Sequence, residues 1–246
     1  MRLSVNVNKV ATVRNSRGGR VPSVLEAARV VVAAGAGGVT VHPRADERHI
    51  TARDVRELAA EFAGSWGPSL EYNIEGDPRP DWVDLVCEVR PAQATLVPVS
   101  PGEVTSHAGW QPELHREILE PAIGRIKDLG IRVSFFVDAE PASIRWARKM
   151  GADRVELYTE PFARAFEQGA EAARRSFETY VEAAELAHAE GLGVNAGHDL
   201  DLENLVLFRE LPHLDEVSIG HAIVSRAIFV GLATVVDEYL RVIRAG

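Results

Sequence analysis

Polar groups that can move protons follow several short apolar runs of this chain. His42 comes directly after one run, Glu71 after a second, Glu156 after a third, and His198 after a fourth. Imidazoles and carboxylates act as general acids and bases when they lie within hydrogen-bonding reach of a substrate. We therefore expect an enzyme in which these four side chains meet at strand ends and carry out acid–base chemistry.

A second group of residues is suited to binding an anion. The loop 42–50 carries His42, Arg44, Arg48 and His49, and two Gly–His pairs end at His198 and His221. Arginine and histidine form charge-assisted hydrogen bonds with phosphate, and glycine lets backbone N–H groups approach an anion closely. These features favour phosphorylated substrates. The alternative for the loop is an ordinary solvated turn, and a lone histidine is more often structural than functional.

Lys9 stands out because the chain has only three lysines, and Lys127 and Lys149 lie on predicted helix surfaces. Lys9 follows the first apolar run, together with Asn6 and Asn8. It is therefore a partner for phosphate or carboxylate, or an amine nucleophile. The remaining alternative is a surface lysine.

The elements that must position these groups alternate between strand and helix. Eight strand–helix units in about 250 residues predict a (β/α)₈ barrel, whose functional groups gather at the carboxyl ends of the strands. A doubly wound open sheet is the alternative, but the Gly-rich turn after its first strand is absent. The apolar runs lie at 3–7, 38–41, 69–70, 93–97, 132–137, 154–155, 193–196 and 216–219, and helices are expected at 24–34, 52–62, 80–89, 113–129, 141–150, 177–190, 202–211 and from 232 onward.

Composition sets the remaining limits. The 246 residues suit one catalytic domain spanning 1–246, and the net charge of −9 argues against a nucleic-acid surface. A single cysteine, Cys87, leaves no disulfide within the chain and no cysteine-based metal site. We find no secretory signal and no membrane-spanning run, so a cytoplasmic location is expected.

Taken together, the motifs resemble the pyridoxine 5′-phosphate synthase family of vitamin B6 biosynthesis. The resemblance covers nearly the whole chain, and the full set of motifs is specific although no single one would suffice. The matching segments are 5–18, 42–50, 70–71, 96–98, 103–105, 133–138, 156–159, 194–198, 219–223 and 226–227.

The resemblance implies a TIM barrel with extra helices that assembles as a homo-octamer. It implies condensation of 1-deoxy-D-xylulose 5-phosphate with 3-amino-2-oxopropyl phosphate to give pyridoxine 5′-phosphate, phosphate and water, with no metal or organic cofactor. Two phosphorylated substrates need two anion sites, which the loop 42–50 and the turn at 220–221 could supply.

Residue roles follow from the same resemblance. His42 and Glu71 would accept protons, His198 would donate one, and Glu156 would stabilise charge in the transition state. The sugar phosphate would be held by Arg44, His49 and Thr105, and the aminoketone phosphate by Asn6, Arg17, Gly220 and His221.

The chain departs from the family pattern at two places. Asn8-Lys9 replaces an Asp–His pair that helps bind the sugar phosphate, and Asp199 replaces a glycine after the histidine at 198. Both changes affect substrate binding more than the class of reaction.

Three alternatives stay open. A Schiff-base aldolase would use Lys9 as its nucleophile. A metal-dependent sugar-phosphate isomerase would use Glu71, Asp138, Glu156 and His198 as ligands. The third is a phosphate-binding scaffold without catalysis.

Overall fold

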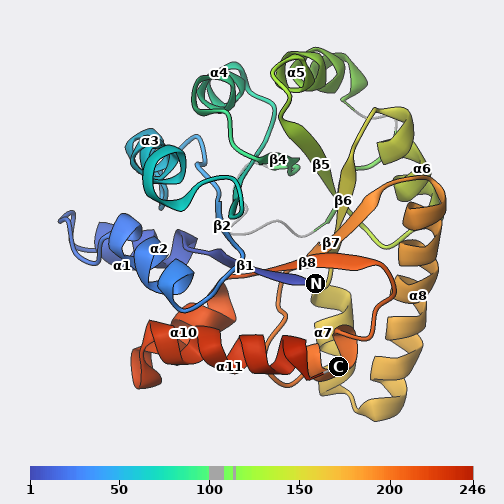
Figure 1. Ribbon diagram of the computed structural model, residues 1–246. Coiled ribbons are helices and arrows are strands. Elements are labelled where there is room, and N and C mark those ends of the chain that lie inside the picture. Colours follow the sequence, from blue (N-terminus) through green and yellow to red (C-terminus); the bar gives the residue numbers. More distant parts are fainter. Residues whose placement is uncertain (100–107, 113–114, 246) are drawn as a thin grey trace.

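Eight parallel strands close into a barrel in which each strand pairs with its neighbours in sequence and β8 pairs with β1. The computed structural model describes residues 1–99, 108–112 and 115–245 (Figure 1). The predicted (β/α)₈ barrel is therefore confirmed. The strands are β1 Arg2–Asn6, β2 Gly38–Val41, β3 Glu71–Gly76, β4 Gln93–Leu96, β5 Arg132–Val137, β6 Arg154–Tyr158, β7 Gly193–Gly197 and β8 Leu214–Ile219.

Helices surround the barrel (Figure 1). Ser23 accepts a hydrogen bond from the Glu26 N–H at the start of α2, and Thr51 and Asp54 form a capping box at the start of α3, as their sequence pattern predicts. The helices are α1 Asn8–Asn15, α2 Val24–Ala33, α3 Ala52–Glu61, the π-helical turn η1 Phe62–Trp66, α4 Pro80–Val89, α5 Arg116–Asp128, α6 Pro141–Lys149, α7 Glu160–Glu167, α8 Ala170–Ala189, α9 Leu205–Phe208, α10 His221–Val230 and α11 Leu232–Arg244. None of these helices, within the described residues, is long and apolar enough to cross a membrane.

The two surfaces of the barrel differ in polarity. The outward residues of the strands, such as Val39 and Ile74, are fully buried against the helices and form the apolar core. The inward residues are polar: the Ser4 and Thr40 hydroxyls lie 2.7 Å apart, and Thr95 donates to Asn73 Oδ1 at 2.9 Å. Buried polar atoms need such partners, and these side chains form a polar column inside the barrel, in which some atoms, such as Ser134 Oγ and Glu216 Oε1, have no hydrogen-bond partner among the described residues.

Two sequence expectations differ from the structure. β3 does not end before Glu71 but begins there, so Glu71 lies at the amino-terminal end of the barrel. Asn8 and Lys9 belong to α1 rather than to a loop, and α7 occupies part of the connection after β6. The sequence did not reveal a strand at 71–76, because its inward residues Glu71, Asn73 and Glu75 are polar and the segment therefore lacks a continuous apolar run.

Candidate active site

His42 follows β2 at the carboxyl-terminal end of the barrel. Its backbone N–H donates to Asn8 Oδ1 at 2.9 Å, and its Nδ1 lies 3.6 Å from Glu75 Oε2. Among the described residues its Nε2 has no hydrogen-bond partner. Burial, and then the charge of Arg44, lower the pKa of His42 to about 3, so the imidazole is neutral at physiological pH.

Glu75 is the functional candidate that the sequence reasoning missed. It lies near the carboxyl end of β3, where Asn6 Nδ2 donates to its Oε2 at 3.4 Å. Burial raises the pKa of Glu75 to about 8, against an opposing effect of Arg44. The available signal was alternation: Glu71, Asn73 and Glu75 share one face of a strand, and only the last of them reaches the rim.

Glu156 lies inside β6 and points into the barrel. Within the described residues its Oε2 has no hydrogen-bond partner, and burial raises the pKa of Glu156 well above its ordinary value, with a further contribution from Glu75. A Cβ on Gly197 would lie 2.5 Å from Glu156 Oε1, so a side chain at that position on β7 would require the Glu156 carboxyl to move. Burial thus favours the protonated form of Glu156.

His198 follows β7 with a left-handed backbone, φ 82°, which is costly for a residue with a side chain. Thr159 Oγ1 donates to the carbonyls of Gly197 and His198, which stabilises this turn. The imidazole packs against the rings of Phe136 and Tyr158, with centroids 5.1 and 5.4 Å away. Burial lowers the pKa of His198 to about 4, so this histidine is also neutral.

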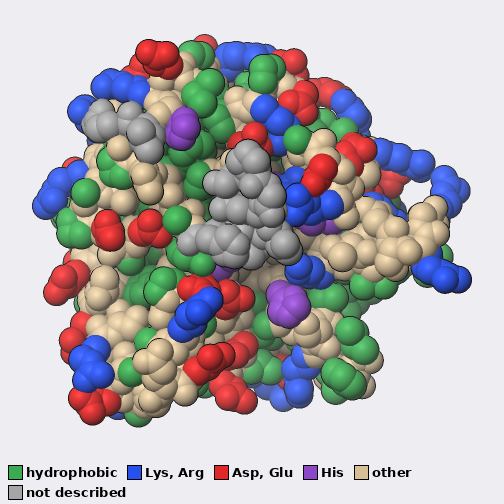
Figure 2. Space-filling model, turned by 180° about the vertical axis from the view of Figure 1, so that it is seen from behind, with side chains coloured by type: hydrophobic (Ala, Val, Ile, Leu, Met, Phe, Trp, Pro, Cys, Tyr) green, Lys and Arg blue, Asp and Glu red, His purple; other side chains and the backbone are tan. Residues whose placement is uncertain are grey.

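The loop after β2 places His49 beside His42, with ring centroids 6.3 Å apart. His49 Nδ1 accepts the Ile50 N–H at 2.9 Å, and Arg14 donates to its carbonyl at 3.1 Å. Burial is the largest of the effects that lower the pKa of His49 to about 3, and the charges of Arg44 and Lys9 contribute to the same shift. The positive charge of Lys9 thus acts on this site. The face seen in Figure 2 shows histidines with basic side chains close by.

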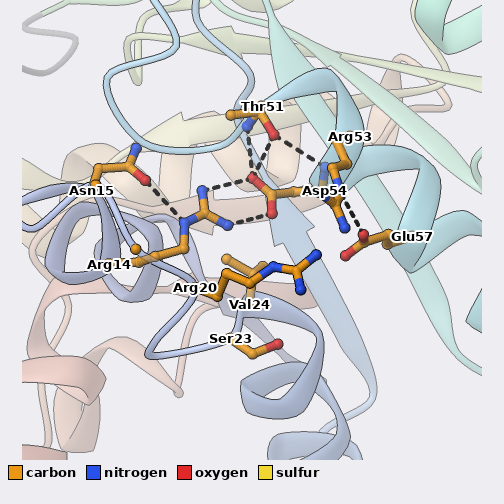
Figure 3. A pocket seen from close by; sticks show the side chains of 11 residues that line it. Arg14, Asn15, Arg20, Ser23, Val24, Thr51, Arg53, Asp54 and Glu57 are labelled. Atoms are coloured by element: carbon orange, nitrogen blue, oxygen red, sulfur yellow. Dashed lines mark hydrogen bonds and ion pairs between the residues drawn. The ribbon is translucent and has the colours of Figure 1, made fainter.

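A pocket of about 600 Å³ lies behind this loop, between α1, the start of α2 and α3. Figure 3 shows the Arg14 guanidinium against the Asp54 carboxylate, with Thr51 on another side of that carboxylate. Arg14 thereby joins the capping box of α3 to the carbonyl of His49. None of the acid–base residues described above lines this pocket, and the contacts of Arg14 connect the loop to helix α3.

The end of β8 supplies a second possible anion site. A Cβ on Gly220 would lie 3.0 Å from the Cβ and backbone oxygen of Asn6, so glycine lets these strand ends approach closely. Helix α10 begins at His221, and its N-terminus offers free N–H groups. His221 itself is exposed.

Glu71 lies away from this rim. Its Oε2 is 2.6 Å from Arg2 Nη2 and 2.5 Å from Arg132 Nη2, and the residue is 3% exposed. Glu75 lies four positions further along the strand than Glu71, which corresponds to a distance of about 13 Å. The expectation that Glu71 meets His42 at a strand end is corrected by the register of β3, and the structure brings together His42, His49, Glu156 and His198 instead.

Three further predicted site residues lie on the surface or outside the described residues. Arg17 is exposed in the turn after α1. Asp199 is exposed with φ 57°, and its carbonyl accepts the Asn204 side chain at 2.9 Å. Thr105 lies outside the described residues. The proposed metal ligands do not converge, because Glu71 is at the far end of the barrel, and the described residues contain no cluster of three or more potential ligands.

A closed parallel barrel with buried histidines and carboxyl groups at its carboxyl rim defines the class of TIM-barrel enzymes that use acid–base chemistry. Solved structures support the fold alone. The chain is similar to phosphoribosyl anthranilate isomerase from Thermus thermophilus (TM-score 0.61, 18% identity, 100% of this chain and 99% of that one). It is also similar to tryptophan synthase α-subunit from Pyrococcus furiosus (TM-score 0.62, 12% identity, 99% and 97%).

Sequence comparison shows the family. The model of pyridoxal phosphate biosynthesis protein PdxJ matches residues 3–245. Pyridoxine 5′-phosphate synthase of Christiangramia forsetii is 50% identical over 99% of both chains. The protein of that name from Bacteroides thetaiotaomicron is 49% identical over 99% of both. The chain belongs to this family.

Proposed function

We propose that the chain is a pyridoxine 5′-phosphate synthase, which condenses 1-deoxy-D-xylulose 5-phosphate with 3-amino-2-oxopropyl phosphate. The observation that carries the proposal is the group of His42, Glu156 and His198 at one rim, in a chain that belongs to the family. The reaction joins an amine to a ketone, loses water and phosphate, and closes an aromatic ring. Each step moves a proton, so several acid–base groups must share one site.

The protonation states suit these roles. A neutral His42 whose Nε2 has no protein partner can accept a proton from the substrate. A neutral His198 can donate its N–H proton to a leaving group. Burial raises the pKa of Glu156 and so favours its protonated form, which can donate a hydrogen bond to oxygen as negative charge develops there.

Two anion sites are proposed around these groups. Arg44 and His49, with Asn8 and Lys9 beside them, are placed to hold the sugar phosphate, and Thr105 is assigned there by resemblance alone. At the other side of the rim, the N-terminus of α10 suits the aminoketone phosphate. The residues proposed for that second site are Asn6, Arg17, Gly220 and His221, and Asp199 is proposed as a substrate-binding residue without assignment to one phosphate.

The family resemblance implies a proton-acceptor role for Glu71, and we retain it as a proposal in which Glu71 acts at a distance from the substrate. From the amino-terminal end it cannot touch a substrate bound at the rim, so it would act through the polar column inside the barrel. Its contacts with Arg2 and Arg132 also give it a structural role.

The homo-octamer, the cytoplasmic location and independence of metals or organic cofactors are proposed on the same resemblance.

The test is direct. Chelator-treated chain, incubated with both phosphorylated substrates, is expected to release inorganic phosphate and form pyridoxine 5′-phosphate in equal amounts. The same samples in light scattering should have the mass of an octamer. Absence of product over a range of pH and substrate concentration would overturn the proposed function.

A further inference from the structure

His42 and Glu75 lie side by side because of strand register. Val41 of β2 pairs with Ile74 of β3, so the residues that follow them both reach the carboxyl rim. His42 is 5% exposed and Glu75 is 9% exposed, and the Nδ1–Oε2 distance is 3.6 Å. The two groups are therefore enclosed together, within reach of one hydrogen bond after a small movement.

The contacts give the two ring nitrogens different roles. Nδ1 faces the carboxylate of Glu75, whose Oε2 is also held by Asn6 Nδ2 at 3.4 Å. Nε2 has no partner among the described residues. A carboxylate that accepts Nδ1–H fixes the tautomer and leaves the lone pair of Nε2 available to a substrate.

Burial makes an isolated imidazole a poor base at this site. It lowers the pKa of His42 to about 3, whereas burial raises the pKa of Glu75 to about 8. A proton added to His42 beside ionised Glu75 gives an imidazolium–carboxylate pair with no net charge. A buried site tolerates such a pair much better than a lone imidazolium.

We propose that Glu75 is a positioning residue that makes His42 an effective general base, so that the two act as one proton-accepting pair. The inference rests on the proposed function. In the step concerned, a proton leaves the substrate and bonds to Nε2, and the electron pair of the broken bond stays on the substrate. Nδ1–H remains hydrogen-bonded to Glu75, and the pair later returns the proton to a leaving oxygen as water forms.

Other groups face this pair and must be considered in any pH profile. Asn6 of β1 contacts Glu75, and Arg44 acts on both members of the pair. The charges of Asp77, Arg48 and Arg79 also change the pKa of His42. On β6, the charge of Glu75 contributes to the raised pKa of Glu156, so this carboxyl also affects the pH profile. His49 lies 6.3 Å from His42, ring to ring.

The experiment compares kcat against pH for the full chain, E75Q, E75D and the control E216Q. Glu216 is a buried carboxyl on the inward face of β8 at the opposite end of the barrel, and burial also raises its pKa to about 8. The wild type and E216Q are expected to share a limb on which kcat rises as the pair loses its proton near pH 8.

E75Q is expected to lose that limb and to fall about tenfold or more in kcat at pH 8, with KM nearly unchanged, because the lone histidine is a weaker base. E75D should restore the limb with a partial rate. A purely structural role would lower kcat without moving the limb, and that result would overturn the inference. An inactive wild type would instead overturn the proposed function.

A second measurement needs no turnover. In ¹⁵N spectra of the wild type above pH 9, His42 is expected to carry its proton on Nδ1, and E75Q should lose this preference. A wild-type His42 that carries its proton on Nε2 under these conditions would contradict the pair.

Discussion

The two ends of the barrel interior hold the same residue types in opposite electrostatic settings. At the amino-terminal end, Glu71 lies in contact with the guanidinium groups of Arg2 and Arg132. At the carboxyl-terminal end, Glu75 on the same strand faces an imidazole and an amide. Glu71 is held in a cluster of ion pairs, whereas burial raises the pKa of Glu75 to about 8, so that Glu75 can exchange a proton near that pH. One strand thus supplies a structural ion and a group that can exchange protons.

The largest expected effect comes from removing the base at the carboxyl end. H42N should lower kcat by about 10² to 10⁴ while the fold stays intact, because general base catalysis contributes that much. Product formation and the circular dichroism spectrum measure the two effects. Activity close to that of the wild type would remove His42 from the mechanism.

At the amino end, E71Q should act mainly on stability. Loss of the charge leaves Arg2 and Arg132 without their shared partner, and we expect the free energy of unfolding to fall by about 1–3 kcal/mol, since both arginines are partly exposed. Urea denaturation measures the change. A loss of kcat as large as that of H42N would show instead that the polar column carries protons between the two ends.

A smaller effect is expected at the edge of the carboxyl end. K9M should raise KM for the sugar phosphate by several-fold, because removing a partly exposed cation near His49 costs about 1 kcal/mol or less. Turnover should persist, and borohydride with substrate should leave Lys9 unlabelled in the wild type. Trapping of Lys9 would restore the Schiff-base alternative.

The smallest effect concerns the pH dependence of stability. Burial raises the pKa of Glu216 from 4.5 to about 8, so the folded chain binds more protons than the unfolded chain between these values. Its stabilising contribution is complete below pH 4.5 and is lost as pH rises through about 8. E216Q should therefore match the wild type at low pH and melt a few degrees higher at pH 9. Equal melting temperatures at pH 9 would contradict the burial of a titrating carboxyl there.

Sequence patterns alone were enough to predict the barrel, most helix boundaries and most of the rim. Alternating apolar runs and helix caps are local signals, so α2, α3 and α4 begin where their caps or proline predict. Helices α1 and α7 were not located in advance, and neither has a side-chain cap at its start. His42 and His198 were found because each directly follows a recognisable strand.

Which glutamate of β3 reaches the site depends on how the strands pair in the folded barrel. Glu71 and Glu75 have the same chemistry and point to the same side of the strand, so their sequence pattern cannot separate them. The pairing of Val41 with Ile74 puts Glu75 beside His42, and the pairing of Gly38 with Glu71 puts Glu71 among arginines. Register is a property of strands brought together from distant parts of the chain, and it determines which carboxyl faces cations and which faces an imidazole.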